Sequence, residues 1–378
     1  MLRSFVKSAI SFGLSRSGAA GLMSSSNGWR NGPLVLGYHR VVKDFAQESR
    51  HSIPAMLISS SMLEHHLDWV GRHYQFVSMQ EACSRLRSKE PFPRPSALVT
   101  FDDGYQDVYQ NAMPLLKRKG IPAAVFVVTR LMGTNRPQIH DELYLLISTA
   151  RSRWLKPAEE FAALLSTLGI QKRQQLELQS LFSRGPFKLT GKLLDLFCYG
   201  DIRRTVEAFE AAVPGQSLES EGLRPLSWQM LEEMRLAGFE VGSHTASHAL
   251  LTNESTADVL QELMSSRLEL EARLGTTMPY FAYPDGRFHS QVVKAVESCG
   301  YDFGFSTCTH RDPEYPLLTV PRKVLWEKSC VNPSGSFDPN VMECQITGLF
   351  DFMAPCTQNH QLPAVLPKLT NVTAHARL

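Results

Sequence analysis

The stretch "ALVTFDDGYQD", residues 97–107, places two carboxylates side by side directly after a short apolar run. Residues 97–101 are predicted to form a buried β-strand, and Gly104 then breaks the apolar pattern. Adjacent like charges repel each other, so one of Asp102 and Asp103 needs a neutralising partner. The stretch therefore predicts a strand of the core sheet with a charged site at its carboxyl end.

Similar short apolar runs recur along the chain and alternate with segments of helical periodicity. Strands are expected within residues 32–42, 97–101, 121–128, 239–241, 279–284, 302–307 and 320–326. Helices between successive strands indicate parallel strands joined by crossover connections. About seven such strands predict an α/β fold, a distorted (β/α) barrel that is closed or nearly closed. A doubly wound open sheet is the main alternative.

The alternation stops between about residues 133 and 225. Four segments of helical periodicity follow one another there without a strand between them: "DELYLLISTA", "PAEEFAALLSTL", "KRQQLELQSLF" and "DIRRTVEAFEAAV". We interpret them as a helical insertion within one α/β domain that covers residues 31–330. Residues 1–30 are predicted to be a flexible basic leader, and residues 331–378 a C-terminal extension with little periodicity.

Composition limits the classes of partner. The 378 residues are 43% hydrophobic and 20% charged, which is typical of a globular protein. A formal net charge of +2 gives no electrostatic reason to expect nucleic acid, so a neutral or polar substrate fits better. The seven cysteines are odd in number and contain no Cys-x-x-Cys pair, so neither a disulfide framework nor a structural zinc cluster is expected.

The sequence contains no apolar run long enough to span a bilayer. The leader carries basic residues and no acid, and its apolar residues fall on one helical face. This pattern is compatible with weak contact between the N-terminus and a membrane surface. The expected location is therefore cytoplasmic or peripheral to a membrane.

Polar side chains gather where the predicted strands end. His39 follows the first strand, Asp102 and Asp103 follow another, and His244 follows the strand in "FEVGS". In a parallel barrel these carboxyl ends share one face, which is where active sites lie. "HTASH" places His248 four residues after His244, so both imidazoles can reach one metal ion if the turn is helical. One carboxylate would complete a three-ligand site with an open position.

Each pattern has a less specific interpretation. An isolated Asp-Asp is usually a turn or a helix cap, and His-x3-His is often two surface histidines. Together, at matching ends of parallel strands, they favour a metal site in which one aspartate binds the ion and the other accepts a proton. A phosphotransferase with an Asp-Asp nucleophile and metal ligand would leave His244 and His248 unexplained.

These motifs resemble those of the polysaccharide deacetylases with a NodB homology domain, carbohydrate esterase family 4. "TFDDGYQD" is similar to the first family motif, "SHTASH" to the second, and "FAYPDG" (281–286) to the third. "GYHRV" near the start and "DEL" at Asp141 resemble a bacterial branch concerned with extracellular or capsular glycans. The resemblance covers about residues 33–330, apart from much of the helical insertion.

The resemblance implies an enzyme that removes an N-acetyl, occasionally an O-acetyl, group from a glycan containing N-acetylhexosamine. It implies that Asp102 is the general base and that Asp103, His244 and His248 bind one divalent metal ion, with zinc the first choice. A backbone N–H near Tyr283 would stabilise the oxyanion. The alternative is a non-catalytic carbohydrate-binding relative that retains recognition without turnover.

The sequence departs from the family pattern in two places. Asp285 stands where the third motif often has an aromatic residue, and the late Leu-x-His, whose histidine protonates the leaving amine, has no clear match. We rank His310 as its substitute above His289 and His39, because His310 follows the predicted strand 302–307 on the metal-bearing face. Arg322 in "VPRKV" is the expected ion-pair partner of Asp102, and an exposed surface arginine is the alternative interpretation.

Overall fold

The computed structural model describes residues 32–215, 221–351, 356 and 358–361. The predicted basic leader (1–30) and the end of the C-terminal extension lie outside the described residues. In the part of the chain that the structure describes, none of the helices combines the length and apolar character that a bilayer span requires.

The core is a nine-stranded sheet whose main path runs β10-β9-β8-β7-β6-β5-β1-β11, while β4 pairs with the start of β5. Its strands are β1 (Leu34–Tyr38), β4 (Gln75–Phe76), β5 (Ser96–Phe101), β6 (Ala123–Val127), β7 (Phe239–Ser243), β8 (Tyr280–Ala282), β9 (Phe303–Ser306), β10 (Val320–Pro321) and β11 (Lys323–Val324). All of these pairs are parallel. The predicted distorted (β/α) barrel is confirmed.

The sheet closes on itself through a single residue. β10 pairs with β9 at one end of the strand order, β11 pairs with β1 at the other, and only Arg322 separates β10 from β11. The Arg322 N–H donates to the carbonyl of Ser306 at 2.9 Å, and the Leu325 N–H donates to Gly37 at 2.9 Å. The single strand predicted over 320–326 is therefore two short strands, because the chain passes from one sheet edge to the other at Arg322.

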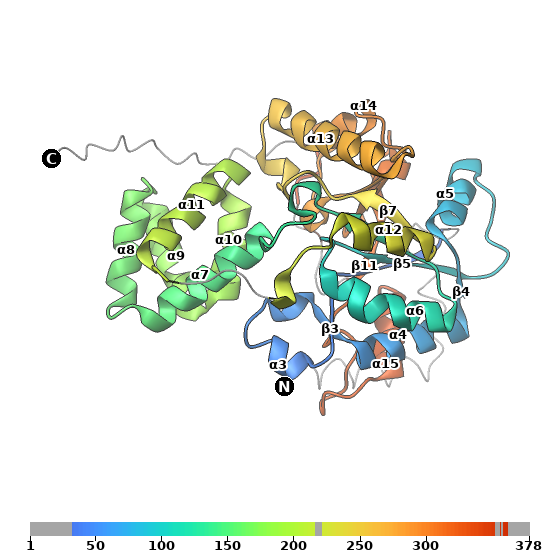
Figure 1. The fold of residues 1–378 in the computed structure, drawn as a ribbon, viewed down its shortest axis with the longest axis horizontal. Helices are drawn as coiled ribbons and strands as arrows, with labels where there is room; N and C mark the ends of the chain where they lie inside the picture. The colour runs from blue at the N-terminus through green and yellow to red at the C-terminus, as the bar shows by residue number, and fades with distance from the viewer. Residues whose placement is uncertain (1–31, 216–220, 352–355, 357, 362–378) are drawn as a thin grey trace.

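Helices cover the outside of the sheet (Figure 1). They are α4 (Ser60–His73), α5 (Met79–Ser88), α6 (Met113–Lys119), α12 (Trp228–Leu236), α13 (Thr256–Leu274), α14 (Ser290–Ser298) and α15 (Pro339–Ile346). The short helix α3 (Phe45–Glu48) lies beside residues 57–59 and buries no side chain. The boundary signals predicted from sequence hold at α5 and α12, where Ser78 and Ser227 accept hydrogen bonds as N-caps. Gly120 ends α6 with φ 64°, a conformation that suits glycine.

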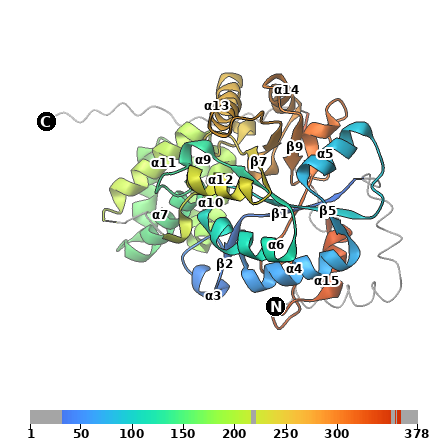
Figure 2. The same cartoon turned by 45° about the vertical axis from the view of Figure 1, so that its right-hand side comes forward.

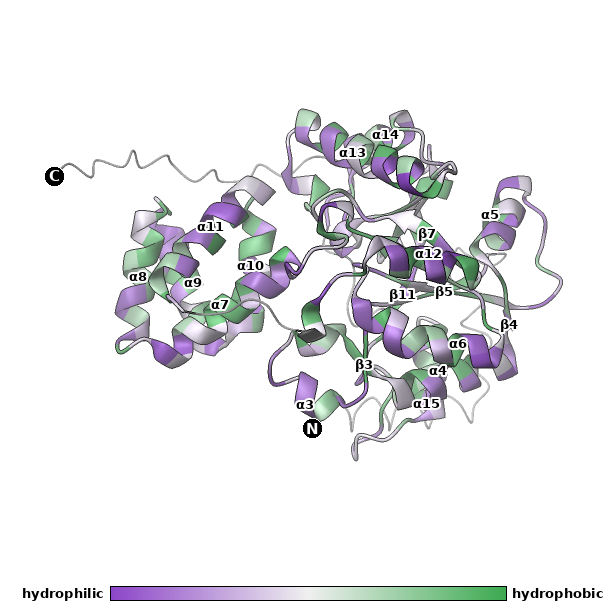
Figure 3. Cartoon of the chain, in the orientation of Figure 1, coloured by the Kyte–Doolittle hydropathy of each residue, from purple (hydrophilic) through white to green (hydrophobic). Residues whose placement is uncertain are grey.

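The predicted helical insertion forms a bundle beside the barrel (Figures 1 and 2). Its helices are α7 (Ile139–Arg153), α8 (Pro157–Thr167), α9 (Lys172–Arg184), α10 (Pro186–Leu196) and α11 (Tyr199–Ala212). They carry hydrophobic and hydrophilic residues on different sides (Figure 3) and bury a core of their own, in which the rings of Phe161 and Phe182 stack at 4.3 Å. The first turn of α7 lies at the barrel, so the bundle is joined to the site through this helix.

Several elements were not predicted, among them α3 and α10, the latter because four helices and not five were expected in the insertion. β4 is two residues long, and the small parallel sheet of β2 (Arg40–Val42) and β3 (Leu57–Ser59) separates from β1 at His39. The expectation of little regular structure after residue 330 is wrong for α15, which begins at Pro339 after the N-cap Asp338. An eight-residue helix gives a weak periodic signal, but the Asp-Pro start was a usable indication of a helix N-terminus.

Candidate active site

Asp102 and Asp103 leave the end of β5 in different directions. The Asp102 N–H donates to the Tyr38 carbonyl at 2.9 Å, which extends the β5–β1 pairing by one residue. Asp103 then has φ 70° and Gly104 has φ 69°. Left-handed backbone is uncommon outside glycine, so this turn holds Asp103 in a strained conformation of the kind that clusters at functional sites. Both carboxylates are buried.

Asp103, His244 and His248 form one group of potential metal ligands. The Asp103 Oδ1 atom lies 3.4 Å from His244 Nε2 and 3.2 Å from His248 Nε2, and the three ligand atoms lie within 4.8 Å of one another. Apart from the His244 and His248 rings, no described residue donates a hydrogen bond to either carboxylate oxygen of Asp103. Buried carboxylate oxygens are normally hydrogen-bonded, so these lone pairs are free for an ion. The predicted triad is therefore brought together.

The surroundings of His244 fix its metal-binding nitrogen. His244 Nδ1 lies 2.8 Å from the Ala282 carbonyl, an acceptor that requires a protonated Nδ1. Nε2 is then the unprotonated nitrogen, and it is the nitrogen that faces Asp103. In metal sites, a hydrogen bond from the ring nitrogen that does not bind the ion, such as this one to Ala282, orients the imidazole. The donor set and its orientation thus fit a divalent ion.

His248 reaches the triad by a turn that was not predicted. A helical turn would bring positions four apart together, but residues 244–250 contain no helix. Thr245 and His248 instead have φ 67° and 63°, and the His248 N–H donates to Thr245 Oγ1 at 2.9 Å. The spacing of four residues does bring both imidazoles to Asp103, but through a turn that is not the helical one assumed from the sequence.

The electrostatics of the ion-free triad favour opposite charges. Burial alone would raise the pKa of Asp103, but His248, His244 and His39 together hold that pKa well below its ordinary value. Burial would lower the pKa of His248, yet the Asp103 carboxylate raises it above its ordinary value. A metal ion binds the neutral imidazole, so the raised pKa of His248 makes ion binding weaker as the pH falls.

Asp102 is paired with Arg322 rather than with the histidines. Arg322 Nη1 lies 2.6 Å from Asp102 Oδ1, and Nη2 lies 2.7 Å from Oδ2, so the contact is bidentate. Burial would raise the pKa of Asp102, but Arg322, with a smaller effect of His244, brings it below its ordinary value. Asp102 is thus held as an anion beside the triad, and Arg322 lies where it was predicted to lie.

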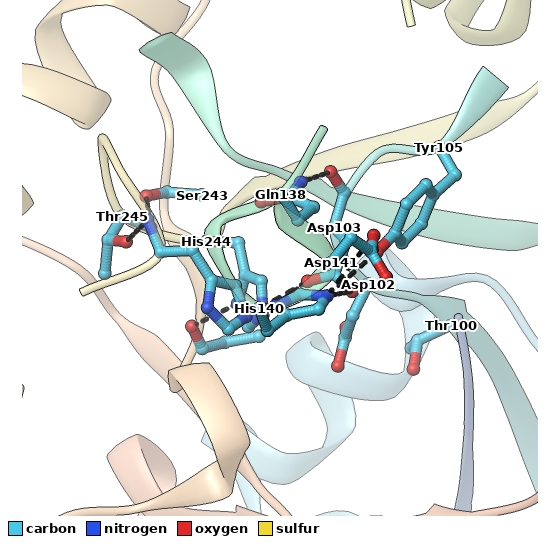
Figure 4. Close-up of polar contacts among 12 residues, drawn as sticks. Thr100, Asp102, Asp103, Tyr105, Gln138, His140, Asp141, Ser243, His244 and Thr245 are labelled. Carbon is cyan, nitrogen blue, oxygen red and sulfur yellow. Dashed lines mark hydrogen bonds and ion pairs between the residues drawn. The ribbon is translucent and has the colours of Figure 1, made fainter. Parts of the chain in front are cut away.

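The first turn of α7 contributes residues to the site that were not predicted (Figure 4). Gln138 Nε2 donates to the Asp103 carbonyl at 2.8 Å, and His140 Nε2 lies 4.0 Å from Asp103 Oδ2. The Tyr105 hydroxyl lies 2.9 Å from His140 Nε2 and donates to Asp141 Oδ2 at 2.6 Å. The "DEL" motif at Asp141 was the available signal, because it placed a polar helix start at the edge of the insertion.

Tyr283 does not use its own N–H at the site. That N–H donates to the Phe305 carbonyl at 3.0 Å, and the buried hydroxyl donates to Leu318 at 2.8 Å. Pro284 has no N–H, so the first candidate oxyanion donor after Tyr283 is the N–H of Asp285. Asp285 has φ 55°, another left-handed residue at this face.

The three histidines considered as proton donors have different surroundings. His39, between β1 and β2, is close enough to lower the pKa of both Asp102 and Asp103. His289 is buried and caps α14, where its Nδ1 accepts from the Val292 N–H at 3.4 Å. His310 is exposed, and its ring stacks on that of His360 at 4.4 Å.

The sequence matches the family described as polysaccharide deacetylase over residues 89–145 and 178–304. It is 32% identical over 111 residues to poly-β-1,6-N-acetyl-D-glucosamine N-deacetylase from Staphylococcus aureus strain MSSA476, which covers 27% of this chain and 38% of that protein. The same enzyme from Staphylococcus epidermidis strain RP62A is 31% identical over 113 residues, or 28% and 39% of the two chains. The chain thus matches less than two fifths of the length of these relatives.

The fold is similar to that of the Streptococcus pyogenes deacetylase PplD, solved in complex with acetate. The TM-score is 0.50 with 16% sequence identity, and the match covers 80% of this chain and 95% of PplD. At this identity the likeness concerns the fold alone.

Proposed function

Because the chain belongs to the polysaccharide deacetylase family, we propose that it is a divalent-metal-dependent hydrolase that removes N-acetyl groups from a glycan. O-acetyl groups are a secondary class of substrate. The proposal rests on one observation above all, the different environments of two adjacent carboxylates. Arg322 binds both oxygens of Asp102, whereas the oxygens of Asp103 face two imidazoles and receive no hydrogen bond from any other described residue.

Asp103, His244 and His248 are the proposed ligands of the ion. Two imidazoles and one carboxylate form a common catalytic zinc set, although the same donors accept other divalent metals. When bound, such an ion supplies Lewis acidity, which polarises a carbonyl and lowers the pKa of water. Gln138 and Ala282 support this set by holding the Asp103 backbone and the His244 ring.

Asp102 is the proposed general base. The carboxylate oxygens of Asp103 face His244 and His248. The adjacent carboxylate of Asp102 is therefore the one available to accept the proton of an attacking water. Arg322 keeps Asp102 ionised and fixes the plane of its carboxylate through two parallel hydrogen bonds. Arg322 is therefore a positioning residue for the base.

Attack of water on the acetyl carbonyl creates a tetrahedral oxyanion. We assign its stabilisation by the protein to the N–H of Asp285, since the neighbouring Tyr283 N–H is already bound to Phe305. The buried Tyr283 ring and Pro284 hold this loop against the sheet. His310 stays our proposed donor of the proton that the leaving amine requires.

A non-catalytic sugar-binding relative is the second candidate, and Asp102 argues against it. A site that only held a metal ion would not need a second buried carboxylate with a dedicated arginine. Burial of an ion pair is costly unless its geometry is good, so this pair is better explained by catalysis than by binding alone.

We propose N-acetylhexosamine glycans as the substrate class, because the staphylococcal relatives are poly-β-1,6-N-acetyl-D-glucosamine N-deacetylases. The test is acetate release from a panel of such glycans, with the full chain loaded with zinc. Wild-type protein should release acetate, and both a chelator and Asp103→Asn should abolish the release. Sugar binding by the wild type with no acetate release from any glycan in the panel would instead support the non-catalytic alternative.

A further inference from the structure

A second group of metal-ligating side chains lies outside the catalytic triad. Cys308 Sγ and Cys356 Sγ lie 3.4 Å and 3.2 Å from the same atom, His360 Nε2, and the three atoms lie within 4.8 Å of one another. Cys308 follows β9 by two residues, and Cys356 and His360 come from the C-terminal extension. Residues 48 positions apart thus converge on one point, which is why sequence spacing gave no sign of this group.

His360 has its metal-binding nitrogen fixed in the same way as His244. Its Nδ1 lies 3.0 Å from the Phe288 carbonyl, so Nδ1 carries the proton and Nε2 presents a lone pair to both sulfurs. The ring packs against Phe288 at 4.4 Å and stacks on His310 at 4.4 Å with an interplanar angle of 7°. The single lone pair of Nε2 can accept from one thiol, and Cys308 and Cys356 also contact each other by a side-chain hydrogen bond, so all three ligand atoms share one small volume.

Both sulfurs also accept a hydrogen bond from the backbone two residues further on. The His310 N–H donates to Cys308 Sγ at 3.3 Å, and the Gln358 N–H donates to Cys356 Sγ at 3.4 Å. Hydrogen bonds to sulfur favour the thiolate, which is the form that binds metals. Burial outweighs them in the ion-free chain and raises the pKa of the Cys308 thiol to about 11, so an ion has to displace the thiol proton. Both cysteines thus have the same N–H···S arrangement and face one imidazole. This is the geometry of a set of metal ligands, and not of two thiols that merely lie side by side.

The C-terminal segment is already docked where such an ion would hold it. The Ser290 N–H donates to the His360 carbonyl at 2.9 Å, and Ser290 Oγ donates to Gln361 at 3.2 Å. Cys308 and Cys356 also line a polar cavity of about 450 Å³ whose wall includes Asp285 and Arg322. The cysteine group therefore lies on the rim of a cavity that reaches the partner of the proposed base.

We propose that Cys308, Cys356 and His360 bind a second metal ion, zinc, with solvent in the fourth position. Two thiolates and one imidazole are soft and borderline donors that select zinc over magnesium or calcium. The ion would join the C-terminal extension to the end of β9 and brace the wall of the cavity beside Arg322. The site shares no residue with Asp103, His244 and His248.

Cobalt distinguishes the two sites, because only the proposed site contains sulfur. Full-length protein, reduced and freed of metal, is titrated with Co²⁺ and its near-ultraviolet absorption is recorded. A sulfur-to-cobalt charge-transfer band should appear in the wild type and disappear in Cys356→Ser. It should persist in Asp103→Asn, which removes a ligand of the catalytic triad, and in the matched control Cys299→Ser. Addition of Zn²⁺ should displace the band, since zinc binds such donors more tightly than cobalt.

Metal analysis of zinc-loaded protein supplies an independent readout. Cys356→Ser should hold about one equivalent less zinc than the wild type, and Cys299→Ser should hold the same amount. Cys356 is exposed, so its replacement by serine should leave the circular dichroism spectrum unchanged. Absence of the cobalt band in the wild type, its persistence in Cys356→Ser, or a Cys308–Cys356 disulfide in protein purified with zinc would overturn the proposal.

Discussion

Arg322 binds both oxygens of Asp102, at 2.6 Å and 2.7 Å, from the one residue that separates β10 and β11. The point at which the sheet closes is therefore also the point that orients the proposed base. The arginine is held there by its N–H bond to Ser306, so its position depends on the strand pairing and not on loop conformation. Closure of the barrel and ionisation of Asp102 are thus coupled.

The two adjacent aspartates should have separable roles. Asp102→Asn should keep the fold and the metal but lose turnover by about 10²-fold or more, the effect of losing a positioned base. Asp103→Asn should lose metal and activity together. Metal analysis and acetate release on the same preparations make this comparison. Near-normal turnover by Asp102→Asn would place the base elsewhere, with His39 the next candidate.

Arg322 should set the acidic limb of the pH–rate profile. Its charge lowers the pKa of the buried Asp102, so Arg322→Met should raise that pKa and move the acidic limb of kcat/KM to higher pH by about 1–3 units. Because removing one partner of a buried pair can unfold a protein, Arg322→Lys is the companion variant. Arg322→Lys keeps the positive charge but loses the bidentate contact, so the acidic limb of its kcat/KM profile should move less than that of Arg322→Met. An unmoved limb in both folded variants would contradict the role of Arg322.

The barrel was predictable because each of its longer strands is a continuous apolar run between turn signals, as in "IPAAVFVV". Asp103 and His244, two of the three proposed metal ligands, were predictable because each closely follows such a strand. Gln138 and His140 were not, since they reach Asp103 only through the docking of α7, which no local pattern reports. Likewise, Cys308 and Cys356 are brought together by the tertiary path of the C-terminal extension.

His140 and Asp141 should make opposite contributions to the pH dependence of stability. Burial raises the pKa of Asp141 to about 7 and lowers that of His140 to about 3. Between about pH 4 and 6.5, the folded chain retains a proton on Asp141 that the unfolded chain has lost. In the same window the unfolded chain holds a proton on His140 that the folded chain lacks. The two slopes of the free energy of unfolding therefore have opposite signs and offset each other.

Replacing one member of this pair should reveal the slope of the other. In Asp141→Asn the free energy of unfolding should rise with pH from about 4 to 6.5 more steeply than in the wild type, because Asp141 no longer offsets the contribution of His140. In His140→Gln it should fall from about pH 4 to 7. Urea unfolding of chelator-treated protein at several pH values measures both, with Glu210→Gln on the exposed surface of α11 as control. Parallel profiles in all variants would contradict the assignment.

The identity of the proton donor is the last question that mutation can decide. An amine leaves a tetrahedral intermediate poorly unless it is protonated, so some group must supply a proton. His310 follows β9 on the catalytic face and is exposed, which lets it exchange protons with solvent, whereas His289 is committed to capping α14. His310→Ala should lower turnover, retain the catalytic metal and remove the alkaline limb of the pH–rate profile.

The same measurement on His39→Ala discriminates the alternatives, since His39 lies close enough to affect both aspartates. Loss of the alkaline limb in His39→Ala, with the limb retained in His310→Ala, would transfer the acid role to His39. If the limb survives in both variants and in His289→Ala, the proton that Asp102 accepts from water must be the one returned to the amine. Turnover would then be slow, because a carboxylate held at a low pKa by Arg322 is a good proton donor but a weak base.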